Sequence, residues 1–295
     1  MKKWNLVVDV AECHGCNNCF VACKDEHVGN NFPGYSAPQP LHGHKWIDIR
    51  YRERGHAPVV DAAYLPTMCN HCDNAPCVAQ GRGAVIKRPD GIVIIDPELS
   101  KGRRDLVDSC PYGAIWWNEE LQVPQTWIFD AHLLDQGWSA PRAAQSCPTS
   151  ALRALKVSDE DMAGIRRDEG LEVLAPEQNT RPRVYYKNLH RFRSNFIGGV
   201  VLLEKQGAID CAANAAAELW QHQVLLQSVK TDAFGEFKFD GVAPHSGIYT
   251  VRLQANEAGS VYRQIEMSGD SIVLQDTVLR QRDDVDTADP CTAIP

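Results

Sequence analysis

The sequence predicts an α+β protein, in which a cysteine-rich domain over residues 1–155 is followed by a small antiparallel β-sandwich over residues 196–282. Two observations predict this division. Nine of the 11 cysteines precede residue 148, whereas the second part has short alternating runs of apolar and polar residues separated by turn signals. The length of 295 residues suits two domains of ordinary size. Between them we expect a connector, 156–195, and after them a polar surface tail, 283–295.

The composition excludes several classes of protein. No apolar run approaches the roughly 20 residues of a membrane span, which excludes an integral membrane protein. The formal charge of −8 argues against nucleic acid as the main partner. The N-terminus has a short apolar stretch and no twin-arginine pair, so we expect a cytoplasmic location. In that compartment, clustered cysteines are more often metal ligands than disulfides.

Local patterns predict the elements of each part. In the first part, β-branched runs predict strands at 4–10 and 91–96, and we expect short helices at 20–26 and 151–156. In the connector, Ser158 is expected to cap the start of a helix. In the second part, strands are expected at 198–203, 223–229, 236–239, 248–253, 261–267 and 272–279.

Four cysteines lie close together near the N-terminus. They are Cys13, Cys16, Cys19 and Cys23. Their spacing is typical of an iron–sulfur loop, in which three cysteines bind one cluster and the fourth binds another. A proline often follows the remote ligand of such a cluster, and prolines follow both Cys110 and Cys147. Structural zinc is the main alternative, although its cysteines usually come as separated pairs.

A second group of three cysteines has a similar compact spacing. It consists of Cys69, Cys72 and Cys77. Alone, this group is compatible with half of a zinc site. Beside the first motif and Cys110-Pro111, it favours a second cluster loop.

The cysteine pattern resembles that of the iron–sulfur subunits of the dimethyl-sulfoxide-reductase family of molybdenum enzymes. The resemblance implies a duplicated bacterial-ferredoxin-like [4Fe–4S] domain for the cysteine-rich part. It also implies two complete sets of cluster ligands. The first set is Cys13, Cys16, Cys19 and Cys147. The second set is Cys69, Cys72, Cys77 and Cys110.

The sequence also departs from this family at seven positions where the resemblance would place cysteine. These positions are Gly81, Ser100, Arg103, Leu106, Trp127, Asp130 and Ala143. We therefore expect two clusters, with Cys23 a buried free thiol beside a lost site. Trp127 and Leu106 are expected to fill space that clusters occupy in relatives. Cys211 and Cys291 are expected to be free thiols as well.

Three further segments indicate a narrower group within this family. Residues 31–35, 110–120 and 181–189 are similar to the small subunits of molybdenum enzymes that hydroxylate or transhydroxylate polyhydroxybenzenes. This resemblance implies a heterodimer in which the large subunit carries bis-molybdopterin guanine dinucleotide and the catalytic residues. The clusters of the small subunit would then serve electron transfer or redox buffering, and no motif in this chain indicates a catalytic site of its own.

Several alternatives stay open at this point. Within the same family they are a pyrogallol–phloroglucinol type of transhydroxylase, a resorcinol-type hydroxylase that exports electrons, and an electron-transfer subunit of another oxidoreductase. Outside it they are a free-standing electron carrier and a zinc-stabilised interaction module. Residues 235–239 and 247–251 resemble transthyretin-like or carboxypeptidase-regulatory-like sandwiches, which host many roles and so indicate no activity.

Overall fold

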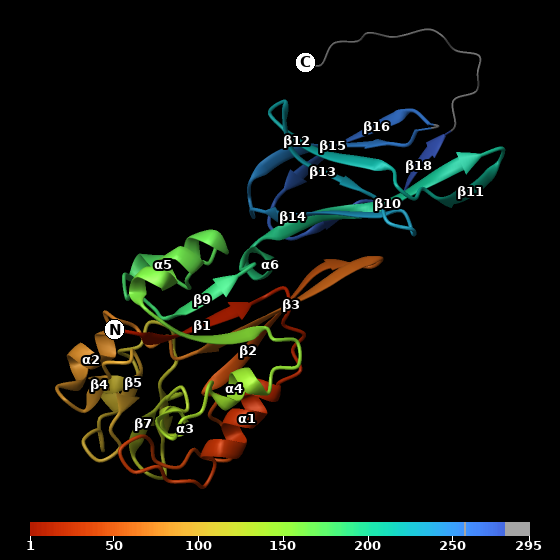
Figure 1. Cartoon of the computed structure of the whole chain (residues 1–295). Helices are drawn as coiled ribbons and strands as arrows, with labels where there is room; N and C mark the ends of the chain where they lie inside the picture. The colour runs from red at the N-terminus through yellow and green to blue at the C-terminus, as the bar shows by residue number, and fades with distance from the viewer. Residues whose placement is uncertain (257, 281–295) are drawn as a thin grey trace. The chain divides into compact units, whose positions relative to one another are not determined.

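The computed structural model describes residues 1–256 and 258–280, so the expected tail at 283–295 lies outside the described residues. The chain divides into two compact units (Figure 1). Unit 1 comprises Met1–Arg52 and Ala63–Phe192, and unit 2 comprises Glu53–Ala62 and the chain from Arg193 onward. No helix in the described part is both long and apolar enough to cross a membrane.

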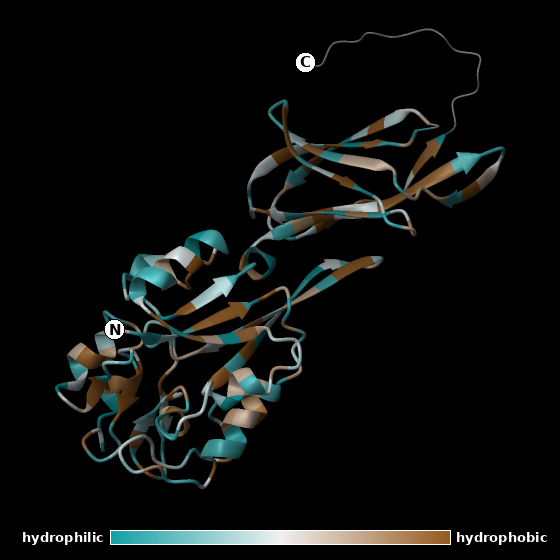
Figure 2. Cartoon of the chain, viewed as in Figure 1, coloured by the Kyte–Doolittle hydropathy of each residue, from teal (hydrophilic) through white to brown (hydrophobic). Residues whose placement is uncertain are grey.

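A three-stranded sheet forms the centre of unit 1. Strand β1 (Lys3–Asp9) lies between β8 (Leu152–Val157), which runs antiparallel to it, and β9 (Val184–Lys187), which runs parallel. Side chains alternate along β1, so Leu6 and Val8 join the main core while Val7 packs on the other face of the sheet. The centre of β1 is therefore buried on both faces, and most of the strand is coloured hydrophobic in Figure 2.

The helix expected at 151–156 is wrong, because Leu152–Val157 forms strand β8. Leu152 and Ala154 pack in the main core, whereas Leu155 and Val157 pack on the other face of the sheet. The strand pairs with β1 from Lys3↔Val157 to Val8↔Leu152. Pairing with a buried strand outweighs the helix propensity of the Ala, Leu and Lys residues in this segment. The segment expected as a connector also contributes to unit 1, since it supplies β9.

Short elements complete unit 1. The helices are α1 (Asn18–His27), α2 (Pro76–Gly81), α3 (Ala131–Asp135), α4 (Arg142–Gln145), α5 (Asp159–Asp168) and α6 (His190–Arg193). Single 3-10 turns lie at Arg104–Leu106 and Pro176–Gln178. The strand pairs are β2 (Ile47–His56) with β3 (Val59–Met68), β4 (Val85–Lys87) with β5 (Val93–Ile95), and β6 (Trp116–Asn118) with β7 (Val123–Gln125). The end of β2 and the start of β3, residues Glu53–Ala62, belong to unit 2.

The predicted cap of helix α5 is confirmed. The Ser158 hydroxyl accepts a hydrogen bond from the backbone N–H of Asp161 at 3.1 Å. The Asp161 carboxylate accepts one in return from the Ser158 N–H. Two backbone donors that would otherwise lack partners are thus satisfied at the helix start.

Unit 2 contains two sheets. The first has strands β10 (Asn195–Lys205), β11 (Ala208–Cys211), β14 (Glu236–Val242), β17 (Ile272–Val273) and β18 (Thr277–Arg280). The second has the order β13 (Val224–Lys230), β12 (Ala216–Gln221), β15 (Gly247–Gln254) and β16 (Ser260–Met267). One apolar core contains side chains from both sheets, including Phe239 of the first and Val251 of the second. This arrangement is a two-layer sandwich.

The expectation that this sandwich is wholly antiparallel is wrong. Strands β17 and β18 run parallel to β10, with Ile197 opposite Ile272 and Leu202 opposite Val278. The chain leaves β16 in the second sheet and crosses to the first before it forms these strands. A crossover of this kind permits parallel pairing, whereas a tight hairpin does not.

A buried arginine stabilises unit 2. The Arg54 side chain is 0% exposed and forms ion pairs with Asp61 and with Asp240, whose Oδ1 lies 2.9 Å from Nη1. We expect Arg54→Met to lower the free energy of unfolding by about 3 kcal/mol, because it leaves two partly buried carboxylates without their main cationic partner. Lys238 contacts both of these carboxylates and should limit the loss of stability. Thermal unfolding measures the change, and the exposed Arg263→Met is the matched control. Equal stabilities of the two variants would contradict the role of Arg54.

Candidate iron–sulfur sites

The β1–β8 pairing brings the first thiol set together. Cys13 and Cys16 lie on the loop between β1 and α1, Cys19 lies in the first turn of α1, and Cys147 lies in the loop between α4 and β8. Because Val8 is opposite Leu152, the two loops emerge at the same end of the strand pair. The Thr149 hydroxyl donates to the Glu12 carbonyl at 2.6 Å, which ties the loops to one another.

The loop that holds this set requires glycine at position 15. Gly15 has a φ of +67°, and a Cβ there would lie 2.4 Å from the ring of Tyr64. Glycine adopts this left-handed conformation at little cost, whereas other residues are strained by it. Tyr64 can therefore pack directly over the cysteine loop.

The thiols of the first set share one electrostatic environment. The pKa of Cys19 is raised to about 12. Burial is the largest cause, and the charges of Cys13, Cys147 and Cys16 also contribute. Burial also raises the pKa of Cys13, and there too Cys147 and Cys16 contribute. Cys13 and Cys19, whose ionisation is opposed in this way, need a cationic partner to become thiolates, as iron would provide.

The second thiol set lines a single small cavity. It consists of Cys69, Cys72, Cys77 and Cys110. Cys69 directly follows β3, Cys77 lies in α2, and Cys110 lies in the loop after the first 3-10 turn. Val93, Ile95 and Ile115 supply apolar walls for the same cavity.

Burial governs the ionisation of this set as well. It raises the pKa of Cys77 to about 12, and the charge of Cys110 adds to the shift. It raises the pKa of Cys72 to about 11, although a hydrogen bond with Thr180 acts in the opposite direction. Thr180 also lies 2.5 Å from the Tyr112 hydroxyl, so it joins the loop before β9 to the cavity wall. The cysteine spacing alone gave no signal for Thr180.

A buried histidine, His71, lies between Cys69 and Cys72 in the sequence. The His71 Nδ1 accepts a hydrogen bond from the Val93 N–H at 3.1 Å and lies 3.8 Å from the Cys69 sulfur. Burial, followed by the charges of Lys87 and Arg183, lowers the pKa of His71 to about 3. The ring is therefore neutral and carries its proton on Nε2.

The second thiol set has the arrangement that a cluster requires. A [4Fe–4S] cluster takes four thiolates around the outside of a cube, so its ligands must surround a space. Cys69, Cys72, Cys77 and Cys110 surround such a space.

Cys23 lies four residues after Cys19 on helix α1, and its side chain is buried. After burial, the charge of Asp130 is the largest cause that raises the pKa of this thiol well above the usual value. Asp130 has partners on both oxygens, since it faces His27 Nε2 at 3.1 Å and accepts from the Arg142 N–H at 2.8 Å. Trp127 and Ala143 are both 0% exposed. The cysteine-lacking positions near Cys23 are thus buried, and Asp130 is hydrogen-bonded, whereas the Trp127 Nε1 has no hydrogen-bond partner in the described part of the chain.

The other cysteine-lacking positions differ in their surroundings, since Leu106 and Gly81 are buried and Arg103 is partly exposed. Leu106 is 0% exposed, as expected, and packs with Val85 and Ile115. A Cβ on Gly81 would lie 2.7 Å from Val85, so a larger side chain does not fit there. Arg103 forms an ion pair with Asp105.

Of the two cysteines outside the cluster region, Cys211 is exposed, and Cys291 lies outside the described residues.

The two thiol sets are those of an iron–sulfur protein, and a family model described as a 4Fe-4S dicluster domain matches residues 60–157. The chain is 46% identical over 279 residues to the pyrogallol hydroxytransferase small subunit of Pelobacter acidigallici, which is 94% of this chain and 96% of that one. The chain therefore belongs to the family of this small subunit.

More distant relatives match a smaller part of the chain. A tetrathionate reductase subunit of Salmonella typhimurium is 31% identical, over 63% of this chain and 73% of its own length. The beta subunit of dimethylsulfide dehydrogenase from Rhodovulum sulfidophilum is 31% identical, over 63% of this chain and 77% of its own length.

Proposed function

We propose that this chain is the iron–sulfur subunit of a heterodimeric molybdenum enzyme that transfers hydroxyl groups between polyhydroxybenzenes of the pyrogallol and phloroglucinol type. The observation that carries the proposal is the 46% identity to a pyrogallol hydroxytransferase small subunit over 94% of this chain. The reductase and dehydrogenase relatives cover only 63% of it. We place the bis-molybdopterin guanine dinucleotide and the catalytic residues in the large partner subunit.

The two thiol sets are the proposed ligands of two [4Fe–4S] clusters. The first set is Cys13, Cys16, Cys19 and Cys147, and the second is Cys69, Cys72, Cys77 and Cys110. Bound clusters would supply one-electron chemistry for electron transfer or redox buffering. The chain's own contribution is to fix the thiols on rigid loops and to surround the second set with apolar side chains that limit the access of water.

The finer architecture forms part of the same proposal. We infer that residues 1–155 are two ferredoxin-like halves, each with one thiol set, and the recurrence of Cys-Pro at positions 110 and 147 supports this duplication. For residues 196–282, the two-sheet arrangement supports a transthyretin-like or carboxypeptidase-regulatory-like sandwich. Its parallel pairs β10–β17 and β10–β18 are the feature to compare with such domains.

The filled space around Cys23 favours chemistry that is redox-neutral overall. A net hydroxylation must export electrons, whereas the transfer of a hydroxyl group from one benzene to another has no net electron to export. Trp127 and Asp130 occupy positions where the family resemblance would place ligands of an intermediate cluster. An unbroken chain of clusters is therefore not expected, and this favours transhydroxylation over a resorcinol-type hydroxylation.

Metal analysis of the purified complex tests the proposal. We expect about eight iron atoms and about eight acid-labile sulfides for each copy of this chain, because each of two clusters holds about four of each. Molybdenum should co-purify with a larger partner chain. Twelve iron atoms would contradict the two-cluster assignment, and a colourless zinc protein would contradict both sites.

An activity assay separates the remaining alternatives. The complex should convert pyrogallol, with a tetrahydroxybenzene as cosubstrate, in the absence of any external electron acceptor. Stoichiometric reduction of an added acceptor with resorcinol would instead identify a hydroxylase that exports electrons. A stable, partner-free preparation with full iron content would identify an electron carrier.

A further inference from the structure

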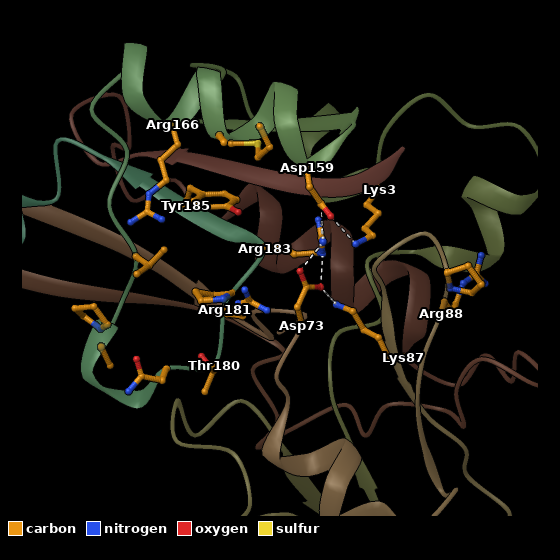
Figure 3. Close-up of a pocket in the computed structure, with 18 residues that line it drawn as sticks. Lys3, Asp73, Lys87, Arg88, Asp159, Arg166, Thr180, Arg181, Arg183 and Tyr185 are labelled. Carbon is orange, nitrogen blue, oxygen red and sulfur yellow. Dashed lines mark hydrogen bonds and ion pairs between the residues drawn. The ribbon is translucent and has the colours of Figure 1, made fainter. Parts of the chain in front are cut away.

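A charged pocket of about 750 Å³ lies in unit 1 (Figure 3). None of the eight cysteines of the two thiol sets lines it, although its lining includes Thr180, which forms a hydrogen bond with Cys72. Six cationic side chains line it, and they are Lys3, Lys87, Arg88, Arg166, Arg181 and Arg183. Only two carboxylates, Asp73 and Asp159, belong to the same lining. The pocket is thus cationic in a chain whose formal net charge is −8.

Four of the six cations already have strong anionic partners. Arg183 is almost fully buried, donates to both oxygens of Asp73 at 2.7 and 2.6 Å, and also contacts Asp159 at 2.8 Å. Lys87 lies 2.9 Å from Asp73, and Lys3 lies 2.7 Å from Asp159. Outside this group, Arg88 is paired with Asp90 and Asp135. These pairs form a fixed floor for the pocket.

Arg166 and Arg181 are the two cations left over. Arg166 comes from α5 and Arg181 from the loop before β9, and both side chains are drawn at the pocket in Figure 3. The Arg166 Nε donates to the Leu171 carbonyl at 3.3 Å. In the described part of the chain, neither guanidinium has a carboxylate within ion-pair distance. Two guanidinium groups at one pocket, with no anion to pair them, match the requirements of an oxyanion.

The backbone beside Arg181 is held in an unusual conformation. Ala175, Asn179 and Arg181 all have positive φ angles, although none is glycine. The Arg181 carbonyl accepts from the Asp73 N–H at 2.9 Å, and the Thr180 carbonyl accepts from the Asn74 N–H at 2.9 Å. These contacts fix the loop that presents Arg181, and such strain is typical of ligand-binding segments.

We propose that this pocket binds a small oxyanion, a phosphate or a carboxylate, between Arg166 and Arg181. Its volume lies within the range of roughly 300–1,000 Å³ that is usual for small-molecule sites. Because the chain as a whole is acidic, the positive charge here is a local feature and not part of a general basic surface. The proposal concerns binding alone and does not depend on the number of clusters.

The test uses the purified complex and inorganic phosphate at constant ionic strength, with succinate as the carboxylate probe. We expect isothermal titration to show binding of at least one of the two anions. Arg166→Gln and Arg181→Gln should each weaken that binding at least tenfold, because each removes one guanidinium. Arg167→Gln is the matched control, since Arg167 lies on the same helix, has a 78% exposed side chain and does not line the pocket.

Three outcomes would overturn the proposal. The first is that neither anion binds the wild-type complex. The second is that Arg167→Gln weakens binding as much as Arg166→Gln or Arg181→Gln, which would show a non-specific charge effect. The third is that the two pocket variants keep anion binding but lose the large subunit, which would assign the arginines to a contact between subunits.

Discussion

Substitution of Cys110 by alanine is expected to remove about four of the eight or so iron atoms from this chain. The Cys110 thiol is the part of the second set that lies farthest from the others in sequence, and it lines their cavity. A cubane needs four ligands, and the apolar walls of this cavity supply no substitute for the lost sulfur. Cys147→Ala should remove the other four iron atoms, because it removes the remote ligand of the first set.

Iron content and the electron paramagnetic resonance spectrum of the reduced complex measure this result. Each variant should retain the signal of one cluster, and the two retained signals should differ. Cys23→Ala is the matched control, since this buried thiol belongs to neither set and its removal should leave the iron content unchanged. Loss of iron from Cys23→Ala would show that Cys23 is a ligand, which would contradict the assignment.

Substitution of Trp127 by alanine is expected to lower the free energy of unfolding by about 4 kcal/mol. The Trp127 side chain is 0% exposed, and its ring centroid lies 4.9 Å from that of Phe129 and 5.7 Å from that of His71. Its removal leaves a large cavity in the core of unit 1, which packed neighbours cannot refill. The midpoint of thermal unfolding should fall by roughly 10 °C.

The matched control for this variant is Trp138→Ala. Trp138 is 41% exposed, so its loss should change the free energy of unfolding by less than about 1 kcal/mol. Unfolding is followed by the visible absorbance of the clusters and by tryptophan fluorescence in the same sample. A Trp127→Ala protein as stable as the Trp138→Ala control would show that the space around Trp127 is not a packed core.

The sequence predicted the parts of this fold that depend on local patterns. The residues of helix α1, the Ser158 cap and most strands of unit 2 are examples, because capping residues and alternation act over a few positions. Cysteine spacing also predicted which segments carry the thiols, since a cluster loop has a fixed short geometry.

Contacts between distant segments account for what could not be predicted. Residues 151–156 and the missed strand β12 (Ala216–Gln221) contain helix-forming Ala, Leu, Glu and Lys, yet both pair with buried strands. Their conformation is decided by partners far away in the sequence. The same is true of Thr180 beside Cys72 and of Asp130 between His27 and Arg142.

The antiparallel pairing of β1 and β8 also sets the relative positions of two cysteines that are far apart in the sequence. Six residue pairs, from Lys3↔Val157 to Val8↔Leu152, determine where Cys147 lies relative to Cys13. A slip by one residue would shift Cys147 by about 3.3 Å and turn the buried side chain of Leu152 outward. The backbone ladder therefore helps to bring these distant thiols into register. We expect a change that disturbs this register to lower the iron content of the first set even when all four of its cysteines are present.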